Sequence, residues 1–203
     1  MLKYNKWLGG SIKYVQTTLV TLAIVVGAMT MSSCGSVEMV VEDRSGAHIE
    51  LDSKIIVGLK NDINNQMGTG KAFSITNDVY EQTVMLTGIV ETSNMRAQAG
   101  DIANAHPGVK QVINELQVIP TIEQKSVEDE GYIDDIVVNT KFYGKMVSTA
   151  GVSHTNWRYN SVNGVMYLFG RALSQAEMNK VISIAKNTEN VRKVVNHAIV
   201  KPL

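Results

Sequence analysis

The chain has 203 residues, of which 44% are hydrophobic, and its 19 basic and 19 acidic side chains leave a formal net charge of zero. This length accommodates one large or two small domains, and the apolar content is ordinary for a globular protein. Cys34 is the single cysteine, which excludes an internal disulfide bond, and no grouping of Cys and His residues has the spacing of a zinc site.

The N-terminal segment 1–33 has the order of a secretory signal peptide. Three lysines without an acidic residue precede a mostly apolar run of about 15 residues, which is short for a membrane span of about 20. Ser32 and Ser33 directly before Cys34 resemble a bacterial lipobox. The resemblance implies cleavage before Cys34 and acylation of its thiol and amino group, and Gly35 as the next residue points to the outer membrane. An uncleaved anchor helix or an ordinary secreted protein is the alternative.

Residues 34–50 have no clear period, and we interpret them as a tether to a first domain at 51–119. In this domain the pattern predicts a helix capped by Asp52 or Ser53, two strands, a second helix and a closing strand. The polar stretch 77–82 is expected to form the turn between the first two strands. One face of the first helix is apolar and is expected to be core: Ile55, Ile56, Leu59 and Ile63.

A polar, acidic linker at 120–131 leads to a second domain at 132–203 that repeats this plan. A helix at about 132–146 is followed by two strands with an Asn-Gly turn between them. The next helix begins with a capping box at 174–177, in which serine and glutamate satisfy free backbone N–H groups, and a final strand closes the domain.

The two domains superpose in sequence when the first is moved by 82 positions. Leu86 then falls on Leu168 and Gly88 on Gly170, and no gap is needed through the following helix and strand. The stretches "VMLTG" and "VMYLFG" are therefore predicted to be equivalent central strands with core side chains. We expect each glycine to let the chain leave the sheet toward the second helix.

The order helix, strand, strand, helix, strand, with Leu-x-Gly ending the second strand and "VRKVVNHAIV" at the close, resembles the BON domain. The resemblance covers both blocks, and two copies behind a lipobox resemble the dual BON-domain lipoproteins of the bacterial outer membrane. It implies an α+β fold of two tandem domains, each α-β-β-α-β with a small mixed three-stranded sheet packed by two helices. It also implies phospholipid binding, mainly by the second domain, and a role in envelope integrity.

Charge separates the two halves of the mature chain. Residues 36–130 carry seven Lys and Arg against fifteen Asp and Glu, a balance of −8, whereas residues 131–203 carry nine against four, a balance of +5. Anionic headgroups attract a basic surface and repel an acidic one. The second domain is therefore the expected membrane-facing one, unless these charges serve only to keep the surface soluble.

The first helix of the second domain has two apolar stripes at 100° per residue. We predict that one stripe is the core face: Ile133, Ile136, Val137 and Thr140. We predict that the other stripe, with lysines beside it, binds phospholipid: Tyr132, Val138, Phe142, Met146, Lys141 and Lys145. The BON resemblance maps membrane-contacting positions of the family onto Tyr132 and Phe142. Asp134 and Asp135 are unfavourable near anionic lipid.

Two alternatives to lipid contact stay open for this helix. Phe142 can instead pack against the first domain, and the same apolar face can hold a protein of the cell envelope, in which case the chain is an interaction adaptor. An anionic phospholipid membrane is the leading partner.

The sequence offers little support for catalysis. The four histidines, His48, His106, His154 and His197, are scattered and belong to no metal or nucleophile motif. Trp157 alternates with Tyr159 on a predicted strand, where sheet packing is the expected use of both side chains. We therefore expect no enzymatic activity, no cofactor, no metal site and no nucleic-acid partner.

Overall fold

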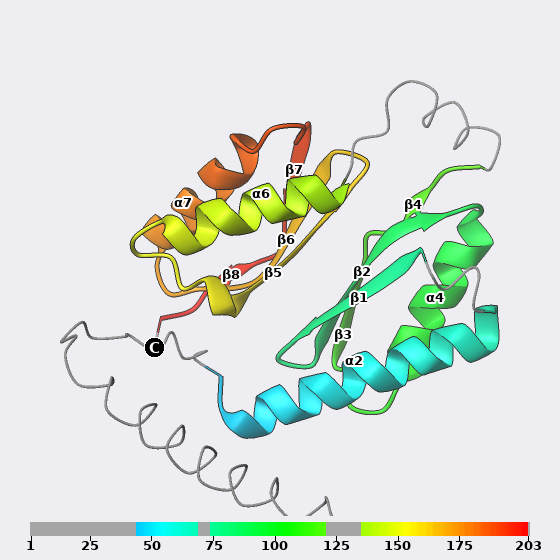
Figure 1. Cartoon of the computed structure of the whole chain (residues 1–203). Coiled ribbons are helices and arrows are strands. Elements are labelled where there is room, and N and C mark those ends of the chain that lie inside the picture. The colour runs from blue at the N-terminus through cyan, green and yellow to red at the C-terminus, as the bar shows by residue number, and fades with distance from the viewer. Residues whose placement is uncertain (1–43, 69–73, 121–134, 203) are drawn as a thin grey trace, which may run out of the picture. The chain divides into compact units, whose positions relative to one another are not determined.

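We analysed a computed structural model of the chain, which describes residues 44–68, 74–120 and 135–202 (Figure 1). Several sequence-based predictions lie outside these residues. They are the signal segment, the lipid anchor Cys34, most of the tether, nearly all of the linker, and Tyr132, Ile133 and Asp134.

The first domain contains two helices and a mixed sheet. Its elements are α2 (Gly46–Met67), β1 (Ile75–Tyr80), β2 (Thr83–Val90), α4 (Ser93–Ala105), β3 (Gln111–Asn114) and β4 (Gln117–Val118). Strand β1 is antiparallel to β2, and β3 and β4 are both parallel to β2. The predicted closing strand is therefore present, but a break between Asn114 and Gln117 divides it into two short pieces.

The second domain has the same topology. Its elements are α6 (Asp135–Ser148), a 3-10 turn η1 (His154–Asn156), β5 (Trp157–Val162), β6 (Val165–Ala172), α7 (Gln175–Lys186), β7 (Lys193–Asn196) and β8 (Ile199–Val200). Strand β5 is antiparallel to β6, whereas β7 and β8 are parallel to it. The α+β fold of two tandem α-β-β-α-β units is confirmed, and Figure 1 shows both helices of each unit on one face of its sheet.

Each domain has its own core between helices and sheet. In the first domain Ile55, Leu59 and Ile63 of α2 pack on β1 and β2 side chains such as Val79 and Leu86. In the second domain the matching positions of α6 and β6 build the core, together with α7. A third cluster lies on the opposite sheet faces and joins the domains: Tyr80, Met85, Val162, Tyr167 and Phe169. Because β2 and β6 are buried on both faces, their sequences are largely apolar and do not alternate.

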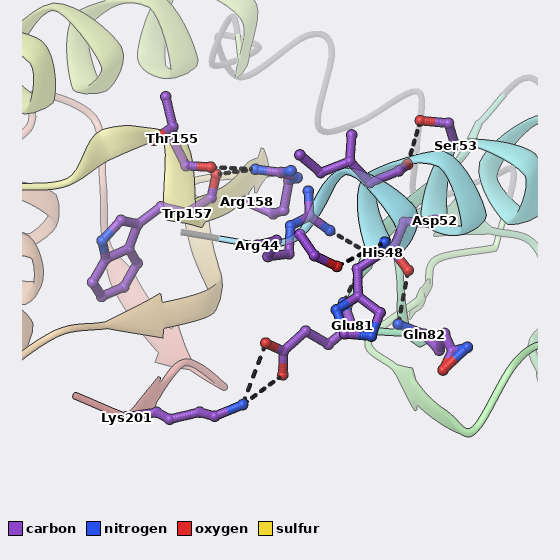
Figure 2. Close-up of polar contacts among 12 residues, drawn as sticks. Arg44, His48, Asp52, Ser53, Glu81, Gln82, Thr155, Trp157, Arg158 and Lys201 are labelled. Atoms are coloured by element: carbon purple, nitrogen blue, oxygen red, sulfur yellow. Dashed lines mark hydrogen bonds and ion pairs between the residues drawn. The ribbon is translucent and has the colours of Figure 1, made fainter. Parts of the chain in front are cut away.

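Helix α2 begins earlier than the sequence predicted. Its N-cap is Ser45, whose hydroxyl accepts a hydrogen bond from the His48 N–H, so the predicted tether is helical from Gly46 onward. Asp52 is therefore inside the helix and 2% exposed, and it does not cap the helix. Its carboxylate accepts the backbone N–H groups of Glu81 and Gln82, and it also pairs with the buried Arg44 (Figure 2).

The contact with Asp52 explains why the sequence pattern predicted the first hairpin turn at the wrong residues. Asn77 to Tyr80 belong to strand β1, and the turn consists of Glu81 and Gln82, which both have positive φ values, of 48° and 65°. Non-glycine residues rarely adopt this conformation. Here the Asp52 carboxylate stabilises the turn by accepting both N–H groups. The turn has no Asn-Gly pair by which the sequence could have predicted it. The equivalent Asn163-Gly164 turn was predicted correctly and is held by Asp135.

The two repeated glycines lie inside the central strands, and not at their ends. Gly88 and Gly170 have φ values of 127° and 111°. A Cβ at Gly88 would lie 1.8 Å from the carbonyl oxygen of Ser74, and one at Gly170 would lie 2.2 Å from that of Asn156. The glycines are therefore needed because the neighbouring backbone approaches too closely for a side chain, and the predicted role in leaving the sheet was wrong.

Replacing Gly170 with valine should lower the free energy of unfolding by at least about 2 kcal/mol, because the new side chain collides with backbone and must adopt a strained φ. Chemical denaturation followed by circular dichroism measures this change. Gly144→Ala in α6 is the matched control, since a Cβ there meets nothing within 4 Å. Equal stability of the Gly170 variant and the wild type would contradict the packing account.

A carboxylate is buried where the two domains meet. Asp78 alternates with Tyr80 on β1, on the sheet face that carries the joining cluster, and its Oδ2 atom is buried without a hydrogen-bond partner. Burial raises the pKa of Asp78 to about 6, and the nearby Arg158 guanidinium only partly opposes that shift. The folded chain thus holds a proton on Asp78 at pH values where the unfolded chain has released it.

This raised pKa predicts a pH-dependent stability. The destabilising effect of the Asp78 charge should grow as the pH rises from about 4 to about 6, and it should be complete above that range. Asp78→Asn should consequently stabilise the protein at pH 7.5, by on the order of 2 kcal/mol, and much less at pH 4. Urea denaturation at the two pH values measures the difference. The same gain at both would refute the assignment.

Candidate functional site

The stripe that the sequence assigned to lipid contact is core. Val138, Phe142 and Met146 are all 0% exposed. The Phe142 ring lies edge-on to Tyr159, with 4.7 Å between the centroids, inside the cluster of buried residues under α6. Because these side chains are sealed between helix and sheet, the prediction that they contact phospholipid was wrong.

The opposite side of α6 is exposed and apolar. Ile136 and Val137, which were predicted to be core, are 77% and 40% exposed, and Thr140 is exposed as well. Tyr143 and Val147 continue the same side one and two turns later, at 48% and 44% exposure. We call Ile136, Val137, Tyr143 and Val147 the α6 outer face. A shallow hollow of about 290 Å³ lies beside it, between Tyr143 and Tyr159.

Lys141 and Lys145 lie on the surface of α6 between the α6 outer face and the core side. Lys141 is exposed, and its Nζ lies 2.6 Å from Oε2 of Glu189. Lys145 is exposed too and donates to the backbone carbonyl of Asn187 at 2.6 Å. Asp135, expected to oppose binding to anionic lipid, is turned toward the Asn163 turn and the Ser161 hydroxyl instead. The predicted flanking lysines are therefore at the surface, and Lys141 lies one turn after Val137 of the α6 outer face.

The first domain provides a comparison for this surface within the same chain. The core residues of the two first helices correspond at an offset of 83, since Ile55, Leu59 and Ile63 match Val138, Phe142 and Met146. At the same offset the four residues of the α6 outer face correspond to Ser53, Lys54, Lys60 and Asn64 of α2. The buried sides are alike, whereas these four outer positions are apolar in the second domain and polar in the first.

The other side chains singled out in the sequence have structural partners. Trp157 is buried, and its Nε1 donates to Glu177, whose carboxylate also accepts the Leu173 N–H near the start of α7. His106 lies 2.6 Å from Asp62, and His197 lies 2.8 Å from Glu115 of the other domain. In the part of the chain that the structure describes, no three His, Cys, Asp or Glu side chains gather as a metal site would require.

Comparison with known proteins identifies the family. The model of the BON domain matches twice, at residues 52–120 and 134–202. A protein of Anaplasma centrale described as the uncharacterized protein in the gshII 5′ region is 35% identical over 128 residues, which are 63% of this chain and 82% of that protein.

Two relatives have names that refer to the cell envelope or to osmotic stress. The outer membrane lipoprotein DolP of Haemophilus influenzae is 29% identical over 116 residues, 57% of each chain. The osmotically-inducible protein Y of Escherichia coli is 27% identical over 126 residues, 62% of this chain and 61% of that protein. The matches thus span about three fifths of these two relatives. Among residues 44–68, 74–120 and 135–202, no helix has the length and apolarity to cross a membrane.

The burial of Phe142 leads to a direct test of which side of α6 is core. Phe142→Ala should destabilise the protein by about 3–5 kcal/mol, because it removes a buried ring and leaves a cavity. Tyr143→Ala, one residue further on the exposed side, should change the free energy of unfolding by less than about 1 kcal/mol. Thermal or urea denaturation distinguishes the two, and a larger effect at Tyr143 would reverse the assignment.

Proposed function

The chain belongs to the BON domain family, and on that premise we propose that it is a noncatalytic outer-membrane lipoprotein whose second domain binds anionic phospholipid and supports envelope integrity. The observation that carries the proposal is the α6 outer face, four exposed apolar side chains on one helix of the second domain. An amphipathic helix with lysines beside an apolar side is suited to lie in the interface of a membrane.

Two energetic terms support the second domain as the membrane-facing one. Transfer of exposed apolar side chains out of water contributes about 25 cal/mol per Å² of apolar area buried. The +5 balance of residues 131–203 adds attraction to anionic lipid, up to about 1 kcal/mol for each Lys or Arg near the surface. The −8 balance of residues 36–130 acts in the opposite direction. Both terms favour the same domain.

The anchor and the α6 outer face would have different roles. Acylation of Cys34 with two or more chains, as its lipobox resemblance implies, would hold the protein at a membrane stably. The α6 outer face would then determine how the second domain lies on that membrane. The relative named an outer membrane lipoprotein supports this location.

The internal repeat provides the variant that tests the proposal. Ile136→Ser, Val137→Lys, Tyr143→Lys and Val147→Asn together give the α6 outer face the residues found on α2. Protein lacking residues 1–34, which has no anchor, should then bind vesicles of anionic phospholipid at least about tenfold more weakly, since several apolar contacts are lost. Co-sedimentation with anionic and with zwitterionic vesicles measures the affinity.

The matched control is on the first domain. Ile56→Asn with Val57→Thr removes two exposed apolar side chains from α2 and installs their counterparts from α6, Asn139 and Thr140. Vesicle binding should not change, and circular dichroism checks that both variants fold. If the α6 variant kept full vesicle binding but lost the capture of an envelope protein, the adaptor function would replace the lipid-binding one.

A further inference from the structure

A basic groove lies between the C-terminal ends of α6 and α7. It has a volume of about 500 Å³ and is lined by Lys141, Gly144, Lys145, Lys186, Thr188 and Glu189, among others. We call it the α6–α7 groove. Three lysines face one glutamate there, and Gly144 adds no side chain, so backbone and ammonium groups are open to a small ligand.

The corresponding place in the first domain is filled. His106 lies over Gly58, so closely that a Cβ there would be 2.6 Å from the imidazole Cε1 atom. Asp62, one turn after Gly58 on α2, holds the ring through its Nδ1 atom at 2.6 Å. This histidine, glycine and aspartate therefore close the space between α2 and the end of α4.

The second domain replaces all three of these residues. Lys141 is at the position equivalent to Gly58, Lys145 at that of Asp62, and Thr188 at that of His106. Thr188 is buried and turns its hydroxyl back to the carbonyl of Ile184, so no side chain enters the groove from that position. The two changes to lysine also convert a neutral-to-acidic site into a basic one.

The lysines of the groove have donors to spare. An ammonium group has three N–H donors, whereas among the described residues Lys141 and Lys145 each have one acceptor, the Glu189 carboxylate and the Asn187 carbonyl. Lys186 is exposed and makes no ion pair with any residue that the structure describes. Gly144 is unfavourable within a helix, and a Cβ built there would meet no described residue within 4 Å, so packing does not require a glycine at this position. A glycine at this position keeps the floor of the α6–α7 groove free of a side chain.

We infer that the α6–α7 groove binds a phosphate anion between Lys141, Lys145 and Lys186, either the headgroup phosphate of a phospholipid or a free phosphate. The inference rests on the proposed function for the first of these sources, because Lys141 and Gly144 bring the groove to the border of the α6 outer face. A membrane on that face would place lipid phosphates at the mouth of the groove.

Glu189 is the internal competitor of such an anion. The hydrogen bond from Lys141 lowers the pKa of Glu189, so its carboxylate is ionised and occupies the donors that a phosphate would use. The pair is exposed, and an exposed ion pair is easily exchanged for another anion. Removing the carboxylate should therefore strengthen phosphate binding, which a merely solubilising lysine cluster would not show.

The test measures lysine acetylation on the full chain by mass spectrometry. In detergent micelles, inorganic phosphate and glycerophosphoglycerol are the probes, and in vesicles phosphatidylglycerol is compared with phosphatidylcholine. Lys141, Lys145 and Lys186 should be acetylated at least about threefold more slowly with phosphate or phosphatidylglycerol, whereas Lys180 and Lys193, outside the groove, should not change. Equal protection of all five lysines would overturn the inference.

Variants separate the groove from the fold and from the α6 outer face. Lys141→Gly, Lys145→Asp and Thr188→His together install the closed arrangement of the first domain and should abolish the protection of Lys186. Lys145→Gln with Lys186→Gln reduces the charge without filling the groove, and should weaken phosphate binding about tenfold. Glu189→Gln should strengthen it.

The outcomes distinguish this inference from the proposed function. If the groove variants bind anionic vesicles as the wild type does, with the same salt dependence, while the α6 outer face variant does not, the proposed function stands and the groove is not a headgroup site. Protection by phosphatidylglycerol vesicles and by glycerophosphoglycerol identifies a headgroup site. Protection by inorganic phosphate alone identifies a site for the free anion, and no protection by any probe refutes the groove as a phosphate site.

Discussion

One polar contact determines which side of each first helix is exposed. Asp52 of α2 and Asp135 of α6 each accept backbone N–H groups from the hairpin turn beneath them. An aspartate bound to that turn must point toward the sheet, so the helix can adopt only one rotation about its axis. In α6 that rotation puts Val138, Phe142 and Met146 into the core and leaves Ile136 and Tyr143 outside. The proposed membrane surface is thus a consequence of a hairpin contact on the other side of the helix.

The sequence predicted the topology because the repeat from the central strand onward has no gap. Strand, helix and closing strand agree at an offset of 82, and their apolar patterns reinforce one another. The same offset does not apply to the first helix, whose core matches at 83, so the position of its buried stripe did not carry over. Both stripes of α6 are apolar, and periodicity alone cannot decide between them. Alignment of Ile55, Leu59 and Ile63 at the shifted offset would have identified the buried one.

Other features of the site depend on contacts between distant residues. The turn at Glu81 and Gln82 contains no glycine or asparagine, and a carboxylate 29 residues earlier stabilises it. The basic groove of the second domain is open because Thr188 turns away, whereas the equivalent His106 lies over Gly58. Neither the turn nor the groove is marked by a pattern of neighbouring residues in the sequence. The sequence could indicate that the second domain is basic, but only the packing of the two helix ends shows where its lysines converge.

Comparison of the two domains separates what the fold requires from what it does not. Gly88 and Gly170, the aspartate under each turn and the buried helix stripe occur in both copies, because each is needed to join the helix to the sheet. The apolar residues of the α6 outer face and the open α6–α7 groove are not repeated at the equivalent described positions of the first domain, whose charge balance is opposite. Apolar side chains exposed to water and like charges brought together both cost stability. The first domain forms the same fold without an apolar strip or a basic groove at these positions. The fold therefore does not require them, and binding is the natural explanation for both.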